Sequence, residues 1–347
     1  MRIRVNRTTW GLAGLTLVIV WAFLWTAPAH RPAPAPRLPA QPPTQRFVPD
    51  PIDGEPVSGA LAARRPIAIM IDNFPEARPQ WGLSAASRVY EAITEGGITR
   101  YLAIFAEHDA ARIGPVRSAR TQFLNYTLEL DAALAHVGGN ADALALIEQL
   151  RVKDLNEFRF GDAFHRIFAP HVAFEHTVFT STDALRAVTQ PGWDEDVTVG
   201  APHWKDDAPP AQRPANQSVS IAFSFPEYAV SWIYRPASND YVRQLGGTED
   251  TDAGTGQALT AKSIAIAVVP RTHGRTVIGE DTWTFSDLGS GQAWVVEDGV
   301  AVTGTWRKAS RIDRLRFFDQ AGNEIAFDRG PEWVEVVPPE VNPVFSP

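Results

Sequence analysis

From Ser218 onward the chain is a series of short strand-like segments separated by turn residues. The segments are SVSIAFSF, AVSWIYR, DYVRQL, SIAIAVVP, TWTFSDL, QAWVVEDG, VAVTGTWRK, RLRFFDQAGNEIAF and EWVEVVP. Asp298-Gly299 and Gly322-Asn323 supply residues that tight hairpins prefer. Short strands at regular spacing, with little helical periodicity, predict an all-β sandwich or barrel in this half of the chain.

Residues 64–190 alternate between strand-like and helix-like segments. RPIAIMID reads as a strand that ends in a turn, because Pro75 and Pro79 prevent its continuation. The segment Leu83–Glu95 is predicted to be a helix that ends at Gly96-Gly97. Its apolar residues that share one helical face are Ala85, Val89, Ala92 and Ile93.

The rest of this half contains further strands and helices. Thr99–Glu107 and Ala111–Val116 are predicted strands, and HVGG at 136–139 is a short strand and turn. Ser118–Leu134 and Ala141–Leu150 are predicted helices, the second with Asn140 as its N-cap. The fold class is therefore predicted to be α+β, with a mixed α/β layered N-terminal domain followed by a mostly antiparallel β C-terminal domain.

Changes in composition give the predicted domain boundaries. They are a signal or anchor helix at 1–28, a Pro-rich tether at 29–63, the α/β domain at 64–190, a connector at 191–217, the β-rich domain at 218–338 and a tail at 339–347. A tether rich in Pro and Ala favours extended polyproline II structure and cannot bury a core.

The N-terminus has the pattern of an export signal. Arg2, Arg4 and Arg7 precede the apolar run Trp10–Trp25, and basic residues stay on the cytoplasmic side. We expect an uncleaved single-pass anchor that leaves the body of the protein outside the cytoplasm. The alternative is secretion after cleavage near Ala27-Pro28-Ala29.

Charge and cysteine content exclude several classes of protein. The formal net charge is −8, and residues 1–49 contain six arginines but no Asp or Glu, so the rest of the chain is strongly acidic. An acidic body is a poor binder of nucleic acid. The absence of cysteine excludes disulfides, thiolate metal ligands and a cysteine nucleophile.

The strongest candidate for a site lies between Ile67 and Arg120. Carboxylates and amides follow two strand-like runs, and arginines recur close by. An arginine fork binds phosphate or carboxylate in a bidentate manner, and a helix N-terminus adds backbone donors. The sequence thus predicts a cleft for an anionic envelope polymer or a lipid-linked precursor, and structural ion pairs are the alternative. The candidate residues are Asp72, Asn73, Arg78, Glu91, Glu95, Arg100, Arg117, Ser118, Arg120 and His171.

Three histidines and a glutamate form a candidate metal site. His165, His171 and His176 lie within twelve residues of one another, next to Glu175. The helical H-E-x-x-H spacing is absent. Turn capping is the alternative role for these histidines, and no metal and no cofactor is assigned.

Catalysis has little support in the sequence, and no catalytic residue is assigned. Ser118 lacks a G-x-S-x-G elbow, and Gly289-Ser290-Gly291 is interpreted as a hairpin turn. Asp72 with Glu91 or Glu95 could form a glycosidase pair. The outline of TRYLAIFAEHDAARIGPVRSAR is similar to envelope phosphotransferases of the LytR-CpsA-Psr type, an analogy at the level of fold. A wall enzyme and a protein–protein scaffold therefore remain open alternatives.

Several uncommon strings resemble the YerB-like bacterial lipoproteins. They are MIDNFPEARPQWGL, VYEAITEGGITRYLAIF, IGPVRSAR, APH at 169–171, TGQALTAKSIAI, GTWRK and GPEWVEVVP. The resemblance implies an envelope-facing protein with two domains and no established biochemical role. Relatives are usually anchored through a lipidated cysteine, which this chain lacks. Similar sequences also often have Asn where this chain has Val172.

Overall fold

The structure is a computed structural model that describes residues 47–189, 192–193, 200 and 203–346. The predicted anchor at 1–28, the tether up to residue 46 and parts of the connector lie outside the described residues. Within the described part of the chain, no helix is long and apolar enough to cross a membrane.

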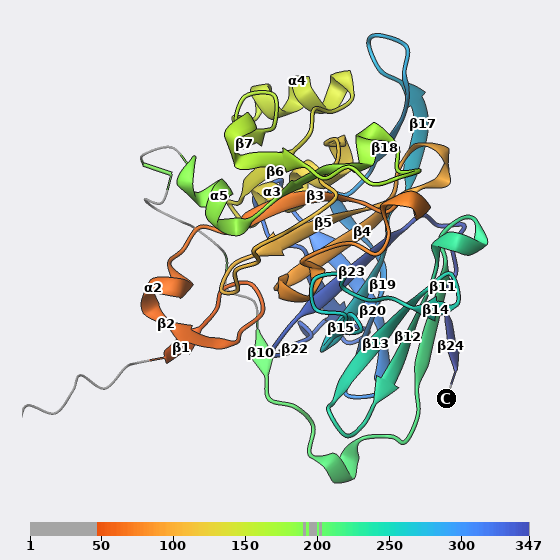
Figure 1. Cartoon of the computed structure of the whole chain (residues 1–347). Helices are drawn as coiled ribbons and strands as arrows, with labels where there is room; N and C mark the ends of the chain where they lie inside the picture. Colours follow the sequence, from red (N-terminus) through yellow and green to blue (C-terminus); the bar gives the residue numbers. More distant parts are fainter. Residues whose placement is uncertain (1–46, 190–191, 194–199, 201–202, 347) are drawn as a thin grey trace, which may run out of the picture. The chain divides into compact units, whose positions relative to one another are not determined.

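A mixed sheet of ten strands runs through the described body (Figure 1). A strand of the C-terminal half, β23, pairs in parallel with β4 of the N-terminal half on one side and with β16 on the other, so both halves share the sheet. The boundary at residues 191–217 stays a prediction. In spatial order the strands are β21 (Arg316–Asp319), β20 (Val300–Lys308), β19 (Gly289–Glu297), β16 (Ser263–Val268), β23 (Glu332–Val337), β4 (Arg88–Ile93), β5 (Thr99–Phe105), β3 (Ile67–Asp72), β6 (Ala133–His136) and β7 (Lys153–Asn156).

A second, six-stranded sheet packs on one face of the large sheet. Val219 and Trp232 from the second sheet share a buried core with Ile69 and Tyr101 from the large one. Its strands are β14 (Thr248–Glu249), β13 (Asp240–Leu245), β12 (Ala229–Arg235), β11 (Ser218–Ala222) and β24 (Val344–Ser346), with β15 (Thr260–Ala261) beside β13. The predicted tail therefore supplies a strand to this sheet.

Helices cover the opposite face of the large sheet. Phe123 of α3 (Thr121–Leu128) and Ile147 of α4 (Ala141–Gln149) share a second buried core with Met70. The remaining helices are short: α2 (Gly59–Ala62), α5 (Thr182–Ala187), η1 (Pro75–Ala77), η2 (Leu83–Ala85), η3 (Glu95–Gly97), η4 (Gly161–Ala163), η5 (Phe174–His176), η6 (Pro210–Gln212) and η7 (Pro226–Tyr228).

Four strand pairs stand apart from the two larger sheets. They are β1 (Phe47–Pro49) with β2 (Pro56–Ser58), β8 (Phe164–Arg166) with β9 (Val178–Thr180), β10 (Trp204–Lys205) with β22 (Phe327–Asp328), and β17 (Arg271–Arg275) with β18 (Asp281–Phe285).

The prediction of a mixed α and β protein is confirmed, with strands predominating. Each of the nine segments after Ser218 contains a strand, and both Asp298 and Gly299 adopt positive φ in the β19–β20 hairpin. Helices form at α3 and α4, and the Asn140 side chain caps α4 by accepting a hydrogen bond from the Ala143 N–H at 2.9 Å.

The helix predicted over Leu83–Glu95 is wrong, because residues 88–93 form β4. All six residues of β4 are buried, since the sheet is covered on both faces. A strand buried on both faces carries no polar alternation, so its apolar residues can also fit a helical face. Gly96 and Gly97 do adopt positive φ, but they turn β4 into β5 rather than end a helix.

Two shorter predictions also differ from the structure. Residues 289–291 lie inside β19 and do not form a hairpin turn. Between Ala111 and Val116 the backbone makes isolated bridges rather than a regular strand.

The last part of the predicted tether is folded. Residues 47–63 form β1, β2 and α2, and the side chain of Ile52 is fully buried. The buried side chains of Ile52 and Val57 show that this segment packs, although its Pro-rich composition predicts an extended chain.

We expect residues 47–200 alone not to reach a native fold. β4 would lose its partner β23, and buried Glu91 would lose its ion pair with Arg243. Thermal unfolding should show one cooperative transition for residues 47–346 and none for the fragment. A fragment with a cooperative transition and native near-UV circular dichroism would contradict this expectation.

Candidate functional site

Asp72 and Arg100 lie opposite each other where β3 ends and β5 begins. They are register partners in the antiparallel pair β3–β5, so their side chains project from the same face of the sheet. Both side chains are buried. A carboxylate and a guanidinium are thus brought to one sheet end by strand pairing alone.

Asp72 is held in the ionised form by its neighbours. Its Oδ1 accepts a hydrogen bond from the Phe74 N–H at 3.0 Å, and its Oδ2 lies 2.6 Å from His176 Nδ1 and 3.1 Å from Arg117 Nε. Burial alone raises the pKa of Asp72, but the His176 hydrogen bond and the charges of Arg100 and Arg117 outweigh it and hold the pKa below its ordinary value.

Backbone hydrogen bonds fix Arg117 between two strands. The Arg117 N–H donates to the Met70 carbonyl at 2.8 Å, and the Arg117 carbonyl accepts from the Val137 N–H at 3.1 Å. Helix α3 then begins at Thr121, with Arg120 at its N-cap position and no side-chain cap. The predicted helix start beside the arginines is therefore present, and it brings unpaired backbone donors to the cluster.

The β4–β5 turn brings a second carboxylate to this cluster. Glu95 stands at the start of the Gly96-Gly97 turn and accepts a hydrogen bond from Arg120 Nε at 2.7 Å. Both side chains are mostly buried, at 25% and 16% exposure for Glu95 and Arg120. We call Arg100, Arg117 and Arg120, with Asp72 and Glu95, the arginine site.

Arg100 is the unusual member of the arginine site. Its Nη1 donates to the Ser118 carbonyl at 3.0 Å, while its buried Nε has no hydrogen-bond partner among the described residues. Within the described part of the chain it makes no ion pair within 4.0 Å, whereas Arg117 and Arg120 each have one. Burial, followed by the charge of Arg120, lowers the pKa of Arg100 to about 9. Three guanidiniums thus face two carboxylates.

Three predicted site residues lie on the other face of the sheet. Glu91 forms a buried ion pair with Arg243, and the Asn73 side chain donates to Thr99 Oγ1 at 2.7 Å. Arg78 folds back on Asn73, donating to its carbonyl at 2.8 Å. Because successive residues of a strand point to opposite faces, Asn73 and Glu91 are separated from the arginine site by the sheet itself.

The remaining two predicted site residues are Ser118 and His171. Ser118 contributes its backbone carbonyl to Arg100. His171 is exposed and has a positive φ of 66°. His165 is also exposed, and His176 is buried against Asp72. The ligand atoms of these three histidines do not converge in the described structure.

Sequence reasoning missed the role of His176 as the partner of Asp72. The two residues are far apart in the chain, and the ring of His176 stacks on Phe74 with centroids 5.1 Å apart. His176 lies two residues before the buried strand β9, VFT, but His171 is directly followed by a similar apolar run, VAF. The local sequence therefore holds no signal that singles out His176.

The arginine site can hold an anion, because guanidiniums form charge-assisted hydrogen bonds to phosphate and carboxylate oxygens. An ionised Asp72 whose oxygens are already bound is a poor proton donor or acceptor. Asp72 is therefore better suited to neutralise its cationic neighbours than to transfer a proton.

Two family models match this chain. The N-terminal domain of a protein of unknown function, DUF3048, matches residues 53–193, and its C-terminal domain matches residues 219–334. YerB of Bacillus subtilis, named as a candidate lipoprotein, is 31% identical over 304 residues, which cover 86% of this chain and 89% of that protein. The crystal structure of YerB from Bacillus subtilis superposes with a TM-score of 0.74 at 25% identity, covering 86% of this chain and 100% of that chain.

We expect Asp72→Asn to lower the free energy of unfolding by about 3 kcal/mol at neutral pH, because it leaves buried cations without their carboxylate. The lowered pKa of Asp72 means that its contribution is fully present above its ordinary value of 3.8 and is lost as the pH falls through the folded-state pKa. The difference between the variant and the unmodified chain should therefore shrink in acid. Urea titrations from pH 7 to pH 3 measure it.

Asp162→Asn is the control, since Asp162 is exposed. It should change the free energy of unfolding by less than about 0.5 kcal/mol at every pH. If the difference in free energy of unfolding between Asp72→Asn and the unmodified chain does not change with pH, the charge of Asp72 is not the cause of the destabilisation.

Proposed function

The chain belongs to the DUF3048 family, as the resemblance in its sequence indicates, and we propose that it is a cell-envelope protein that binds an anionic envelope molecule at the arginine site. The observation that carries the proposal is Arg100, a buried guanidinium whose Nε has no hydrogen-bond partner and which makes no ion pair within 4.0 Å among the described residues. An unpaired buried charge costs free energy, which an incoming anion would recover.

The location in the envelope rests on the N-terminal sequence and on the relative. Three arginines before an apolar run favour an anchor with the body outside the cytoplasm. YerB of Bacillus subtilis is named as a candidate lipoprotein, and this chain has no cysteine for a lipid. The apolar segment Trp10–Trp25 would then take the place of the lipid.

The ligand class follows from the donors. Arg117 is the most accessible arginine of the site, with 25% of its side chain exposed, and Arg120 and Arg100 lie deeper. Because the exposure of the three arginine side chains decreases from Arg117 to Arg100, the site suits a phosphate or carboxylate group that enters past Arg117 and reaches Arg100. A phosphate-bearing wall polymer or a lipid-linked pyrophosphate carries groups of this kind.

The enzyme alternatives have weaker support. Asp72 and Glu91 project from opposite faces of the sheet, so they cannot flank one glycosidic bond. Glu95 is bound to Arg120. A scaffold role would use protein contacts, and it predicts no binding of small anions.

Isothermal titration with inorganic pyrophosphate should detect one site on the full chain. Arg117→Gln and Arg120→Gln should each weaken binding by about ten- to a hundredfold, because each removes a charge-assisted hydrogen bond of about 1.5–3 kcal/mol. Arg275→Gln is the matched control, since it also removes one arginine but from a side chain that is 72% exposed. No binding of pyrophosphate or of citrate to the unmodified chain would refute the proposal.

Arg100→Met separates a ligand site from a structural one. If Arg100 serves a ligand, the variant should lose pyrophosphate binding and keep or raise its melting temperature, because an uncompensated buried charge is removed. If Arg100 holds the fold, the melting temperature should fall instead. Differential scanning calorimetry of both proteins without ligand makes this comparison.

A further inference from the structure

A second polar cluster lies at the opposite end of β5 from Arg100. Asp50 and Asp53 come from the loop between β1 and β2. Glu107 lies two residues after the end of β5. All three side chains are buried, at 0%, 0% and 7% exposure. One carboxylate oxygen from each lies within 4.8 Å of the other two.

Each of these carboxylates has one oxygen that the fold uses. Asp50 Oδ1 accepts the Ile52 N–H at 2.7 Å, Asp53 Oδ1 accepts the Glu55 N–H at 3.0 Å, and Glu107 Oε2 accepts the Ser87 hydroxyl at 2.6 Å. These bonds hold the three groups in fixed positions. The cluster is therefore rigid before any ligand arrives.

The other oxygen of each carboxylate is buried without a hydrogen-bond partner among the described residues. These atoms are Asp50 Oδ2, Asp53 Oδ2 and Glu107 Oε1. Buried polar atoms are almost always satisfied, and three exceptions within one cluster of carboxylates indicate that a positive group is missing beside them.

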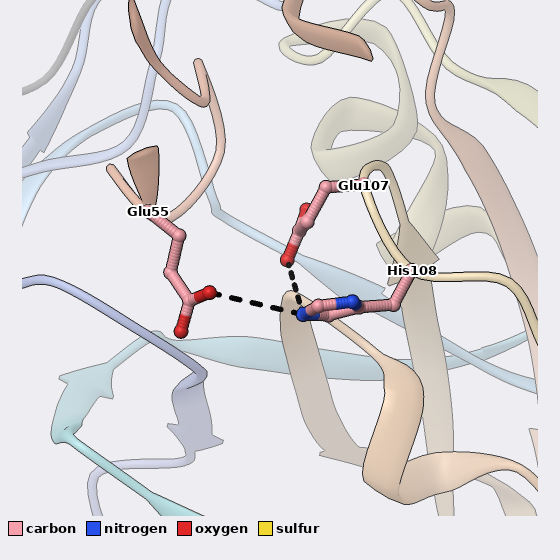
Figure 2. A group of neighbouring side chains, drawn as sticks. All are labelled: Glu55, Glu107 and His108. Atoms are coloured by element: carbon pink, nitrogen blue, oxygen red, sulfur yellow. Dashed lines mark ion pairs between the residues drawn. The ribbon is translucent and has the colours of Figure 1, made fainter. Parts of the chain in front are cut away.

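The protein supplies little positive charge to this cluster. Within the described chain, the ion pairs of these three carboxylates are limited to His108, whose Nε2 lies 3.5 Å from Glu107 Oε1. Figure 2 shows His108 at the outer side, between Glu107 and Glu55, with Glu55 Oε2 at 3.8 Å. Arg314 acts on Asp50 only at longer range, and its Nη1 donates to the Pro51 carbonyl.

We propose that Asp50, Asp53 and Glu107 bind one hard divalent cation, with Glu55 at the outer side. Oxygen ligands alone favour Ca²⁺, Mg²⁺ or Mn²⁺ over Zn²⁺, which prefers nitrogen and sulfur. The flexible geometry of Ca²⁺ sites suits three carboxylates and added water, so Ca²⁺ is the first probe. This inference is independent of the arginine site.

Binding would fasten the N-terminal segment to the body. The loop Asp50–Glu55 comes from the segment that follows residues 1–46, whereas Glu107 lies two residues after the end of β5 and Ser87 directly precedes β4. The Asp53 carbonyl also accepts the Gly330 N–H at 3.1 Å, next to β23. One cation would thus join the first described residues to the central sheet.

A proton is the competing occupant. Burial, and then the charge of Glu107, raise the pKa of Asp53 to about 10. A protonated Asp53 could share its proton with Glu107 and relieve the repulsion without a metal. A bound proton and a bound cation can be told apart by experiment. Only cation binding makes the melting temperature rise and then level off as a divalent salt is added.

The experiment measures thermal unfolding of the full chain after EDTA has removed bound metals. CaCl₂, MgCl₂ or MnCl₂ is then added up to 10 mM at constant ionic strength. A saturable rise in melting temperature on the order of 5 °C is expected with at least one of the three salts. Asp53→Asn, which mimics the protonated side chain, should abolish the rise without lowering the melting temperature in EDTA. Asp206→Asn, at a carboxylate that is 96% exposed, should keep the rise.

Terbium luminescence gives a second readout that does not depend on stability. The ring of Trp204 packs on Gly54, where a Cβ would lie 2.5 Å from its Cγ. Tb³⁺ bound at Asp53 should therefore emit when tryptophan is excited, and Ca²⁺ should displace it. If Asp53→Asn does not fold, the unmodified chain still decides. The proposal is overturned if that chain shows neither a melting shift with any of the three salts nor Trp-sensitised emission, or if Asp53→Asn shows the same shift.

Discussion

The pairing of β23 between β16 and β4 is the constraint on which the rest of the structure depends. Both pairs are parallel, so the strand joins residues that are more than two hundred positions apart into one sheet. A buried network crosses the same region. Arg243 is paired with Glu91 and Asp250, and Glu335 of β23 accepts a hydrogen bond from Trp232 Nε1 at 2.8 Å. Burial, followed by the charge of Glu91, raises the pKa of Glu335, which favours the neutral form of this carboxyl beside the two carboxylates that pair with Arg243.

This placement explains where the two polar clusters lie. Strand β5 stands near the middle of the ten-stranded sheet, with the arginine site at its first residues and the Asp50–Asp53–Glu107 cluster just after its last. The two clusters have opposite electrostatic character. One has a guanidinium in excess, and the other has carboxylates in excess. Charged groups are tolerated at these depths because the ends of a central strand are enclosed by loops that supply hydrogen bonds to most, but not all, of their atoms.

Much of the secondary structure could be predicted from local signals, and the failures have physical reasons. Local signals predicted the strands in the nine C-terminal segments, helix α3 and the capped helix α4. Each of these elements depends on turn residues and periodicity that lie within a few positions of it in the chain. Strand β4 failed because burial on both faces removes the alternation of polar residues. Within the candidate site, Asp72, Arg100, Arg117 and Arg120 do come together, but Glu91 does not. Proximity in sequence predicts which residues reach a sheet end, whereas the face each one occupies depends on strand register, which is set by pairing across the sheet.

The ten-stranded sheet also has two outer edges, and their side chains bear on aggregation. An exposed strand edge is a template for another chain, and charged residues discourage such pairing. The edge strand β7 carries Lys153 and Asp154, which pair with Asp131 and His136. The opposite edge strand, β21, is shielded where Glu324 bridges to Phe318. These features at the two edges disfavour the addition of a strand from another molecule.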